Sequence, residues 1–132
     1  MKRILFDSYA ILKWIQMEPG FDRVKKLIES CRDASVAGYI NQINLGEVYY
    51  ITIREVGLDR AKVFLENFLR LPIQIILPDS ELIWKASEIK AIYPISYADC
   101  FAVATALTYG AVILTGDPEF KKAEKLVKLE WL

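Results

Sequence analysis

Four carboxylates stand at positions where they could share one metal site. Asp7 directly follows the apolar run KRILF, and Asp117 comes shortly after the apolar run AVIL. Glu47 and Asp99 lie in the early turns of helical patterns. Carboxylates that converge raise each other's pKa and destabilise the fold unless a cation neutralises them. Oxygen ligands without histidine or cysteine suit Mg²⁺ or Mn²⁺, so the four acids predict a divalent-metal site.

The residue types that are missing narrow the chemistry further. The chain has no histidine, which excludes a Ser-His nucleophile pair, paired-histidine RNA cleavage and the usual zinc sites. Cys31 and Cys100 each lie in an apolar helical context, where a free buried thiol is expected and a disulfide framework is not. Any chemistry must therefore come from carboxylates, hydroxyls, lysines or a hard metal ion.

Each carboxylate also has a structural interpretation. Asp7 could be a solvated strand end, Asp99 has the spacing of a capping box, and Asp117 precedes a proline and could cap a helix. Glu47 is harder to explain in this way because its helix is apolar on nearly every side, although Arg54 could pair with it two turns on. The convergence of all four acids, rather than any single position, favours the functional interpretation.

Alternating strand and helix patterns place these residues. Short runs rich in Ile, Leu and Val predict strands at residues 2–6, 35–40, 73–77, 111–114 and 127–131. Apolar residues at helical spacing, with capping residues at the ends, predict six helices that begin at or near Ser8, Phe21, Asn41, Asp59, Asp79 and Ser96. The first of these is expected to reach Met17, and the last, residues 96–109, is apolar nearly all round and is expected to be buried.

Strands that alternate with helices in this way predict a three-layer α/β/α fold around a mostly parallel sheet of four to five strands, in one domain over residues 1–132. Ligands of such sheets bind at the carboxyl ends of the strands. Asp7 and Asp117 follow strands, and Glu47 is early in the helix after a strand. Asp99 begins a helix that runs antiparallel to the next strand, so its N-terminus lies at the same edge. All four carboxylates are therefore expected at one edge of the sheet.

The bulk composition limits the possible partners. With 132 residues, 54% of them hydrophobic and 26% charged, the chain fits one soluble domain. Its formal net charge is zero, whereas nucleic-acid binders usually carry a basic excess, so such binding must rest on a local patch or a bound cation. No apolar run is long enough to cross a membrane and no signal peptide is visible, so we expect a cytoplasmic location and no membrane partner.

The ordered set of motifs resembles the PIN-domain ribonucleases, and its size and spacing look most like their VapC-type toxin branch. The motifs are Asp7-Ser8 after the first strand, Asn44 three residues before Glu47, Asp99 at the start of an alanine-rich helix, and the segment TGDPEF at 115–120. Each motif is short, but their order and spacing are specific. The resemblance covers essentially the whole chain.

This resemblance implies an Mg²⁺- or Mn²⁺-dependent endoribonuclease, the toxin of a type II toxin–antitoxin pair that inhibits translation. It also implies a homodimer, and a small antitoxin whose C-terminal segment blocks the acidic cleft. A housekeeping nuclease without an antitoxin stays open. By resemblance, the family's acidic residues map onto Asp7, Glu47, Asp99 and Asp117, its hydroxyl position onto Thr115, and polar neighbours of its site onto Ser8 and Asn44.

The mechanism can also be argued from the residues alone. Four bare carboxylates would repel a phosphodiester, whereas a bound Mg²⁺ reverses the local field and lowers the pKa of a bound water. Asp117 or Glu47 could orient that water or take its proton. Water as the nucleophile makes the 2′-hydroxyl unnecessary and leaves a 5′-phosphate. Four lysines could contact the backbone phosphates of RNA: Lys13, Lys90, Lys121 and Lys122.

Two other classes of protein are open. A Mg²⁺-binding phosphoacceptor signalling domain would use Asp79 after the third strand and Thr115 after the fourth. It would also need an acidic pair after the first strand and a lysine after the fifth, and it gives Glu47 no role. A binding protein with a vestigial site is the second class, although all four acids are present. Phosphorylation by acetyl phosphate tests the first class, and Mg²⁺-dependent cleavage tests the second.

Overall fold

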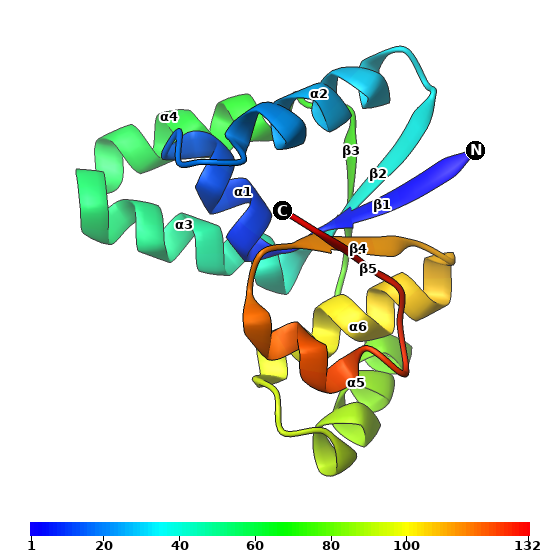
Figure 1. The fold of residues 1–132 in the computed structure, drawn as a ribbon. Helices are drawn as coiled ribbons and strands as arrows, with labels where there is room; N and C mark the ends of the chain where they lie inside the picture. The colour runs from blue at the N-terminus through cyan, green and yellow to red at the C-terminus, as the bar shows by residue number, and fades with distance from the viewer.

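The centre of the molecule is a five-stranded sheet in which every neighbouring pair of strands is parallel. The computed structural model describes residues 1–132, and its strands are β1 Lys2–Phe6, β2 Val36–Asn41, β3 Ile73–Ile76, β4 Val112–Thr115 and β5 Leu129–Trp131. Their order in the sheet is β3-β2-β1-β4-β5. The predicted parallel sheet is confirmed, with β1 at its centre (Figure 1).

Helices make every connection between strands. They are α1 Ser8–Ile15, α2 Phe21–Arg32, α3 Gln42–Val56, α4 Leu58–Phe68, α5 Ser80–Ile92, α6 Tyr97–Tyr109 and the 3-10 helix η1 Pro118–Ala123. Because parallel strands joined by crossovers all run the same way, their carboxyl ends meet at one edge of the sheet. This edge, where Phe6, Asn41 and Thr115 end their strands, is called the carboxyl edge below.

Side chains alternate between the two faces of the sheet and build two separate cores. On one face, Leu5 and Ile113 pack with residues of α5, α6 and η1. On the other face, Ile4, Phe6 and Leu114 pack with residues of α1, α2, α3 and α4. Figure 1 shows α5 and α6 on one side of the strands and α1 and α2 on the other. The predicted three-layer α/β/α fold is confirmed, and none of the helices has the length and apolar character needed to cross a membrane.

Helix α6 is the buried helix that the sequence predicted. Every residue from Cys100 to Ala106 is buried, because α6 contacts β1, β2 and β4 on one side and α5 on the other. Ser96 is its N-cap and Gly110, at φ 63°, is its C-cap, both as predicted. The two cysteines, Cys31 and Cys100, are free and buried, which also agrees with the prediction.

Several boundaries differ from the sequence prediction by one to three residues. Asp7, not Ser8, is the N-cap of α1, because its longer side chain reaches the backbone N–H of Ala10. Helix α1 ends at Ile15 rather than Met17, and Met17 has a positive φ of 53°, which no helix continues. The helix η1 was not predicted, because six residues after a proline carry too little apolar periodicity to reveal a 3-10 turn.

Candidate active site

Asp7 ends the central strand and begins the first helix. Its surface is 2% exposed, and its Oδ1 accepts the backbone N–H of Ala10 at 2.7 Å. Burial raises the pKa of Asp7 to about 7. The Thr115 hydroxyl and the Ala10 bond act in the opposite direction, and the charges of Asp99 and Asp117 raise the pKa further. A carboxylate buried in this way is a costly anion, which a nearby cation would stabilise.

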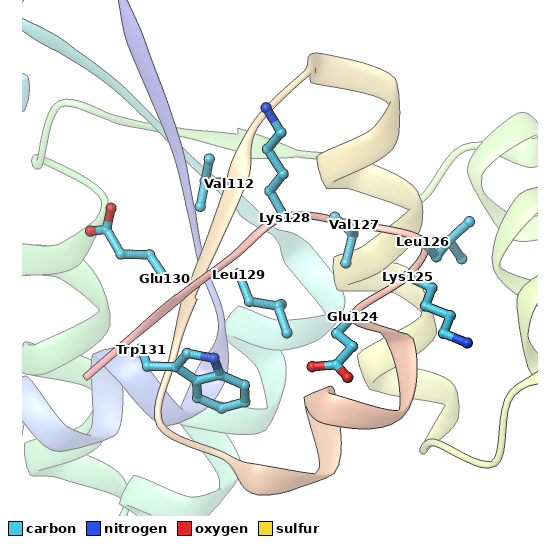
Figure 2. A pocket seen from close by; sticks show the side chains of 9 residues that line it. All are labelled: Val112, Glu124, Lys125, Leu126, Val127, Lys128, Leu129, Glu130 and Trp131. Atoms are coloured by element: carbon cyan, nitrogen blue, oxygen red, sulfur yellow. The ribbon is translucent and has the colours of Figure 1, made fainter.

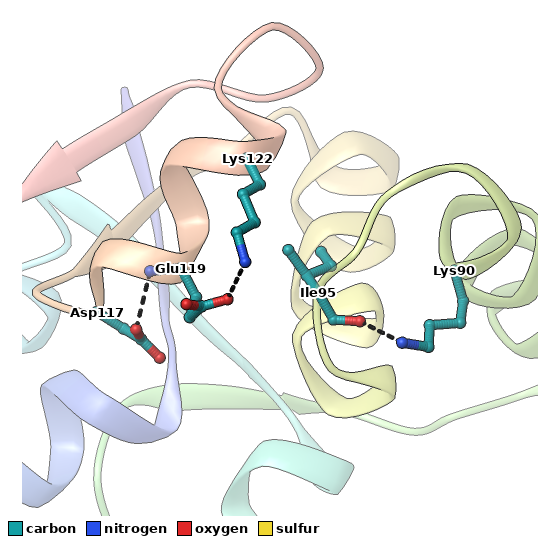
Figure 3. Close-up of polar contacts among 5 residues, drawn as sticks. All are labelled: Lys90, Ile95, Asp117, Glu119 and Lys122. Carbon is teal, nitrogen blue, oxygen red and sulfur yellow. Dashed lines mark hydrogen bonds and ion pairs between the residues drawn. The ribbon is translucent and has the colours of Figure 1, made fainter.

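Asp117 lies in the turn after β4 and caps η1. The Oγ1 of buried Thr115 accepts the backbone N–H of Asp117 at 3.0 Å, and Asp117 Oδ1 accepts that of Glu119 at 3.0 Å. Figure 3 shows the second of these bonds at the start of η1. Pro118 follows as the first helical residue. Asp117 thus has the capping role that the sequence offered as its structural interpretation, and its second carboxylate oxygen makes no hydrogen bond within the chain.

Asp99 reaches the same edge from the first turn of α6. The Oγ of Ser96 accepts its backbone N–H at 3.1 Å, which fixes the start of the helix. Burial raises the pKa of Asp99 to about 6; Ser96 lowers it, and the charges of Asp117, Glu47 and Glu119 raise it again. Asp99 is thus the carboxylate on which the negative charges of acidic residues from other elements act together.

Glu47 is half-buried on α3 and is held there by Asn44. Asn44 Nδ2 donates to Glu47 Oε1 at 3.3 Å and to the carbonyl oxygen of Ala98 at 3.1 Å, so it joins α3 to the first turn of α6. Asn44 is fully buried and its Oδ1 has no hydrogen-bond partner. Arg54, which the sequence offered as a structural partner for Glu47, forms no ion pair with it. The Arg54 guanidinium instead lies 5.0 Å from the centroid of the Tyr50 ring.

The four predicted carboxylates therefore come from four elements and meet in one electrostatic field. Asp7 feels the charges of Asp99 and Asp117, and Asp99 feels those of Asp117 and Glu47. As the side chains stand, no group of three or more acidic residues is arranged to hold a metal ion. Asp7 and Asp117 each have an oxygen turned to a helix N-terminus. The fold brings the acids to one edge, but joint ligation of one ion needs side-chain rotations.

The other polar residues of the predicted site differ in their surroundings. Ser8 is half-buried in the first turn of α1 and its hydroxyl makes no hydrogen bond within the chain. Two of the predicted phosphate-binding lysines already have partners (Figure 3): Lys122 Nζ lies 2.7 Å from Glu119 Oε2, and Lys90 Nζ donates to the carbonyl oxygen of Ile95 at 2.7 Å. Lys121 is exposed, and Lys13 Nζ lies 5.1 Å from the centroid of the Tyr9 ring.

A broad hollow of about 710 Å³ runs along β5 and the turn before it, away from the four carboxylates. Figure 2 shows its lining, which includes Leu129, Glu130 and Trp131. Glu130 is not a fifth member of the acidic group, because its two oxygens lie 2.9 Å from Lys2 Nζ and 2.7 Å from an Arg23 nitrogen. These ion pairs tie the edge strand to β1 and α2 and indicate a structural role for Glu130.

Comparison with protein-family models matches the PIN domain over residues 4–126, a span that includes all four carboxylates. The chain belongs to the PIN domain family. The predicted resemblance to this family is therefore confirmed, and the acidic edge of the sheet lies inside the part of the chain that matches.

Solved structures share the fold of this PIN domain. A chain in the structure of VapBC2 from Rickettsia felis bound to promoter DNA is 16% identical, with 98% of each chain covered and a TM-score of 0.76. A chain of DNA-bound VapBC from Salmonella typhimurium is 17% identical, with 98% of each chain covered and a TM-score of 0.73. VapC20 from Mycobacterium tuberculosis, a toxin that cleaves the sarcin-ricin loop, is 19% identical over 91% of this chain and 94% of its own, with a TM-score of 0.71. No curated protein sequence matches the chain.

Two acidic residues outside the predicted group of four, Glu119 and Asp79, differ in where they lie in this PIN domain. The negative charge of Glu119 helps to raise the pKa of Asp99, and this residue was not singled out from the sequence. The signal that could have revealed it is its position two residues after Asp117, in the same turn. Asp79, the acid that a phosphoacceptor domain would need, instead accepts the backbone N–H of Leu82 at 2.9 Å as the N-cap of α5. It lies in a hollow with Thr108 and Tyr109, at the C-terminal end of α6, whereas Asp99 is at the N-terminal end.

Proposed function

We propose that this PIN domain is a Mg²⁺- or Mn²⁺-dependent endoribonuclease and the toxin of a toxin–antitoxin pair. The observation that carries the proposal is the meeting of Asp7, Asp99 and Asp117 at the carboxyl edge, with the pKa of Asp7 raised to about 7 and that of Asp99 to about 6. Carboxyl groups with a strongly raised pKa occur most often at functional sites, because holding their negative charge destabilises the folded state. Glu47, held by Asn44 beside the start of α6, is the fourth acid of the proposed site.

The donor atoms fit a hard divalent cation. They are carboxylate oxygens, with the buried and unpartnered amide oxygen of Asn44 beside Glu47, and they include no nitrogen or sulfur ligand. In the proposed site, Asp7, Glu47, Asp99 and Asp117 hold the ion. When bound, Mg²⁺ or Mn²⁺ supplies positive charge that offsets the phosphate and lowers the pKa of water.

The remaining roles belong to the side chains. Asp117 has a carboxylate oxygen without a hydrogen bond, and in the proposed mechanism Asp117 or Glu47 would orient the attacking water or accept its proton. Thr115 holds the backbone of Asp117 in the turn. The Ser8 hydroxyl is available for a water or a phosphate oxygen. Hydrolysis by water forms a P–O bond to the incoming oxygen, expels the 3′-oxygen of the preceding nucleotide and leaves a 5′-phosphate.

The test is RNA cleavage by charge-neutral variants. Asp7→Asn and Asp99→Asn keep size and capping ability but remove a charge, so cleavage with Mg²⁺ should fall by several orders of magnitude while the circular dichroism spectrum is unchanged. Asp79→Asn is the matched control, since Asp79 is also a helix N-cap but lies at the far end of α6. Cleavage by either site variant at the rate of the control would show that the metal site is wrongly assigned.

The proposed toxin role rests on similarity to chains from toxin–antitoxin structures. The proposed antitoxin would insert an Arg or Lys among the carboxylates, since a guanidinium binds carboxylates bidentately and brings the positive charge that the metal would bring. Mixing the PIN domain with the product of a neighbouring short reading frame tests this. The complex should no longer bind Mn²⁺ or cut RNA; a complex that does both as well as the free protein contradicts the blocked-site proposal.

A further inference from the structure

Tyr9 packs against the turn that carries Asp117. It lies on α1 two residues after Asp7, and a Cβ placed on Gly116 would come within 2.5 Å of the Tyr9 Cε1 and 3.2 Å of two further ring atoms. Any side chain at position 116 would therefore have to displace the ring. Tyr9 thus stands near the ends of β1 and β4. It is two residues from one proposed metal ligand, Asp7, and its ring lies against the residue before another, Asp117.

The rest of the Tyr9 ring is not built into the core. Tyr9 is half-buried and its hydroxyl makes no hydrogen bond within the chain. One turn further along α1, Lys13 places its Nζ 5.1 Å from the ring centroid. The two side chains line a hollow of about 150 Å³ together with Leu12, Gln16 and Glu18. Glu18 is the one acidic group in this lining, so it opposes the charge of Lys13 there.

We propose that Tyr9 and Lys13 form the subsite for one unpaired nucleotide of the substrate, the nucleotide next to the cleaved phosphodiester. This rests on the proposed ribonuclease function. The base stacks on the Tyr9 ring in place of the Lys13 ammonium, which moves to the phosphate of the same nucleotide. An aromatic face accepts any base, and a lysine beside it supplies a contact to the phosphate, which in a chain of zero net charge must come from single local cations.

The position of the pair favours this ligand over a purely structural role. Tyr9 and Lys13 are both half-buried and both line the same hollow, so part of the ring and of the lysine stays accessible there. Here the cation lies over the ring, as expected for an electron-rich face that has room for a second planar or charged group. Both residues stand on the helix that begins at Asp7, so a nucleotide bound there would present its phosphate to the carboxyl edge.

Binding of a fluorescein-labelled single-stranded oligoadenylate, followed by anisotropy in EDTA, tests the subsite without cleavage or metal. Every protein in this comparison, its wild-type reference included, also carries Asp99→Asn, which lessens the repulsion of the phosphates by the acidic edge. Tyr9→Leu should weaken binding roughly 5- to 100-fold, whereas Tyr9→Phe, which keeps the ring, should bind like the wild type. Lys13→Met should reduce the slope of log affinity against log salt by about 0.7, the value for one lost contact to single-stranded phosphate. Lys85→Met is the matched control, because Lys85 lies 3.4 Å from Thr108 at the opposite end of α6.

The outcomes separate this proposal from the proposed function. If the wild type cuts RNA with Mg²⁺ but Tyr9→Leu binds oligoadenylate as tightly as the wild type, the subsite is wrong and the nuclease stands. Equal losses for Tyr9→Leu and Tyr9→Phe would also overturn it, since the hydroxyl rather than the ring would then matter. If Tyr9→Leu does not fold, the salt dependence of Lys13→Met decides, and a slope equal to that of Lys85→Met overturns the subsite.

Discussion

At the scale of single residues, Asp7 combines a structural and an electrostatic role in one carboxylate. Its Oδ1 caps α1 through Ala10, which stabilises the helix. Its burial at the end of β1 makes the negative charge unfavourable, and the pKa rises to about 7. The capping bond survives a change to Asn and the charge does not, so the two contributions can be separated by one substitution.

The raised pKa of Asp7 predicts how stability depends on pH in EDTA. The folded-state pKa of about 7 lies above the ordinary value of 3.8 for an aspartate, so between these values the folded state binds more protons than the unfolded state. The contribution of Asp7 to the free energy of unfolding is therefore largest below about pH 4. It falls as the pH rises to 7, by on the order of a few kcal/mol. Urea unfolding of wild type and Asp7→Asn between pH 4.5 and 8 measures it. The difference between the two proteins should shift in favour of Asp7→Asn with rising pH; a constant difference contradicts the assignment.

The contact between Gly116 and Tyr9 predicts a non-additive pair of substitutions. Gly116 does not have a positive φ, so the backbone itself accepts alanine, and only the Tyr9 ring at 2.5 Å opposes the new Cβ. Gly116→Ala should displace the ring, and with it the turn of Asp117, and lower both thermal stability and RNA affinity. In Tyr9→Leu the same glycine change should cost much less. Melting temperatures of the four proteins form the cycle, and full additivity would show that the ring is not what Gly116 accommodates.

Single residues also show what the sequence could and could not predict. The types and positions of Asp7, Glu47, Asp99 and Asp117 were enough to expect them at one edge, because strand ends and helix starts fix the direction of the chain. The contact of Tyr9 with Gly116 joins residues far apart in the sequence, and no local pattern reveals it. The alternative that paired Glu47 with Arg54 fails for a similar reason, since helical spacing alone does not show that the Arg54 guanidinium lies at the Tyr50 ring.

At the scale of elements, the site is built from helix starts at the carboxyl edge. Asp7 caps α1, Asp117 caps η1 and Asp99 follows the cap of α6. Capping motifs and apolar runs are local signals, so most starts and strands were predicted to within two residues. The short helix η1 and the exact ends were not, because those depend on how the chain packs beyond each turn. The link between α3 and α6 is likewise a tertiary feature.

Asn44 is the residue through which we expect that link to act on catalysis. Asn44→Ala removes the bonds to Glu47 and to the Ala98 carbonyl oxygen and should destabilise the fold by about 1–3 kcal/mol. It should also lower kcat, because Glu47 is no longer held. Thr105→Val is the matched control, since it removes a second buried link to α6, the 2.9 Å bond from the Nδ2 of Asn41, which ends β2 and caps α3. Both should shift the urea midpoint, and only Asn44→Ala should lower kcat under folding conditions; equal kcat values would make Asn44 purely structural.

At the scale of the whole molecule, a bound metal ion should stabilise the folded state. The four acids repel one another without a cation, and an ion that binds only the folded protein raises its melting temperature. Millimolar Mn²⁺ should therefore raise the melting temperature of the wild type. Asp99→Asn should melt higher than the wild type in EDTA and lose most of the Mn²⁺ effect. A wild-type melting temperature that does not respond to Mn²⁺ would argue for carboxylates that act separately.

The surface of the whole molecule bears on the predicted homodimer. Five aromatic residues on or beside the helices are candidates for such an interface, where Tyr and Trp are favoured. Of these, Trp14, Tyr49 and Tyr93 are half-buried and belong largely to the packing of the chain. The others, Tyr50 and Trp84, are exposed at 45% and 65%. Trp84 lies on α5 two turns before Ile92, which is 76% exposed. Residues eight apart lie about 80° from each other around a helix, within the width of one apolar stripe, so α5 presents two large apolar groups toward the same side.

We therefore expect a two-fold symmetric dimer in which the α5 faces of two copies meet, because a closed isologous contact would bury these groups together. Light scattering at micromolar concentration should give twice the monomer mass of 15.1 kDa. Trp84→Glu combined with Ile92→Glu should give a folded monomer, since two like charges would then face each other across the symmetry axis. Val63→Glu, at a position 58% exposed on α4, introduces the same charge elsewhere and should leave the dimer intact. A monomeric wild type would rule out the dimer, and a dimer that survives the double substitution would place its interface on another face.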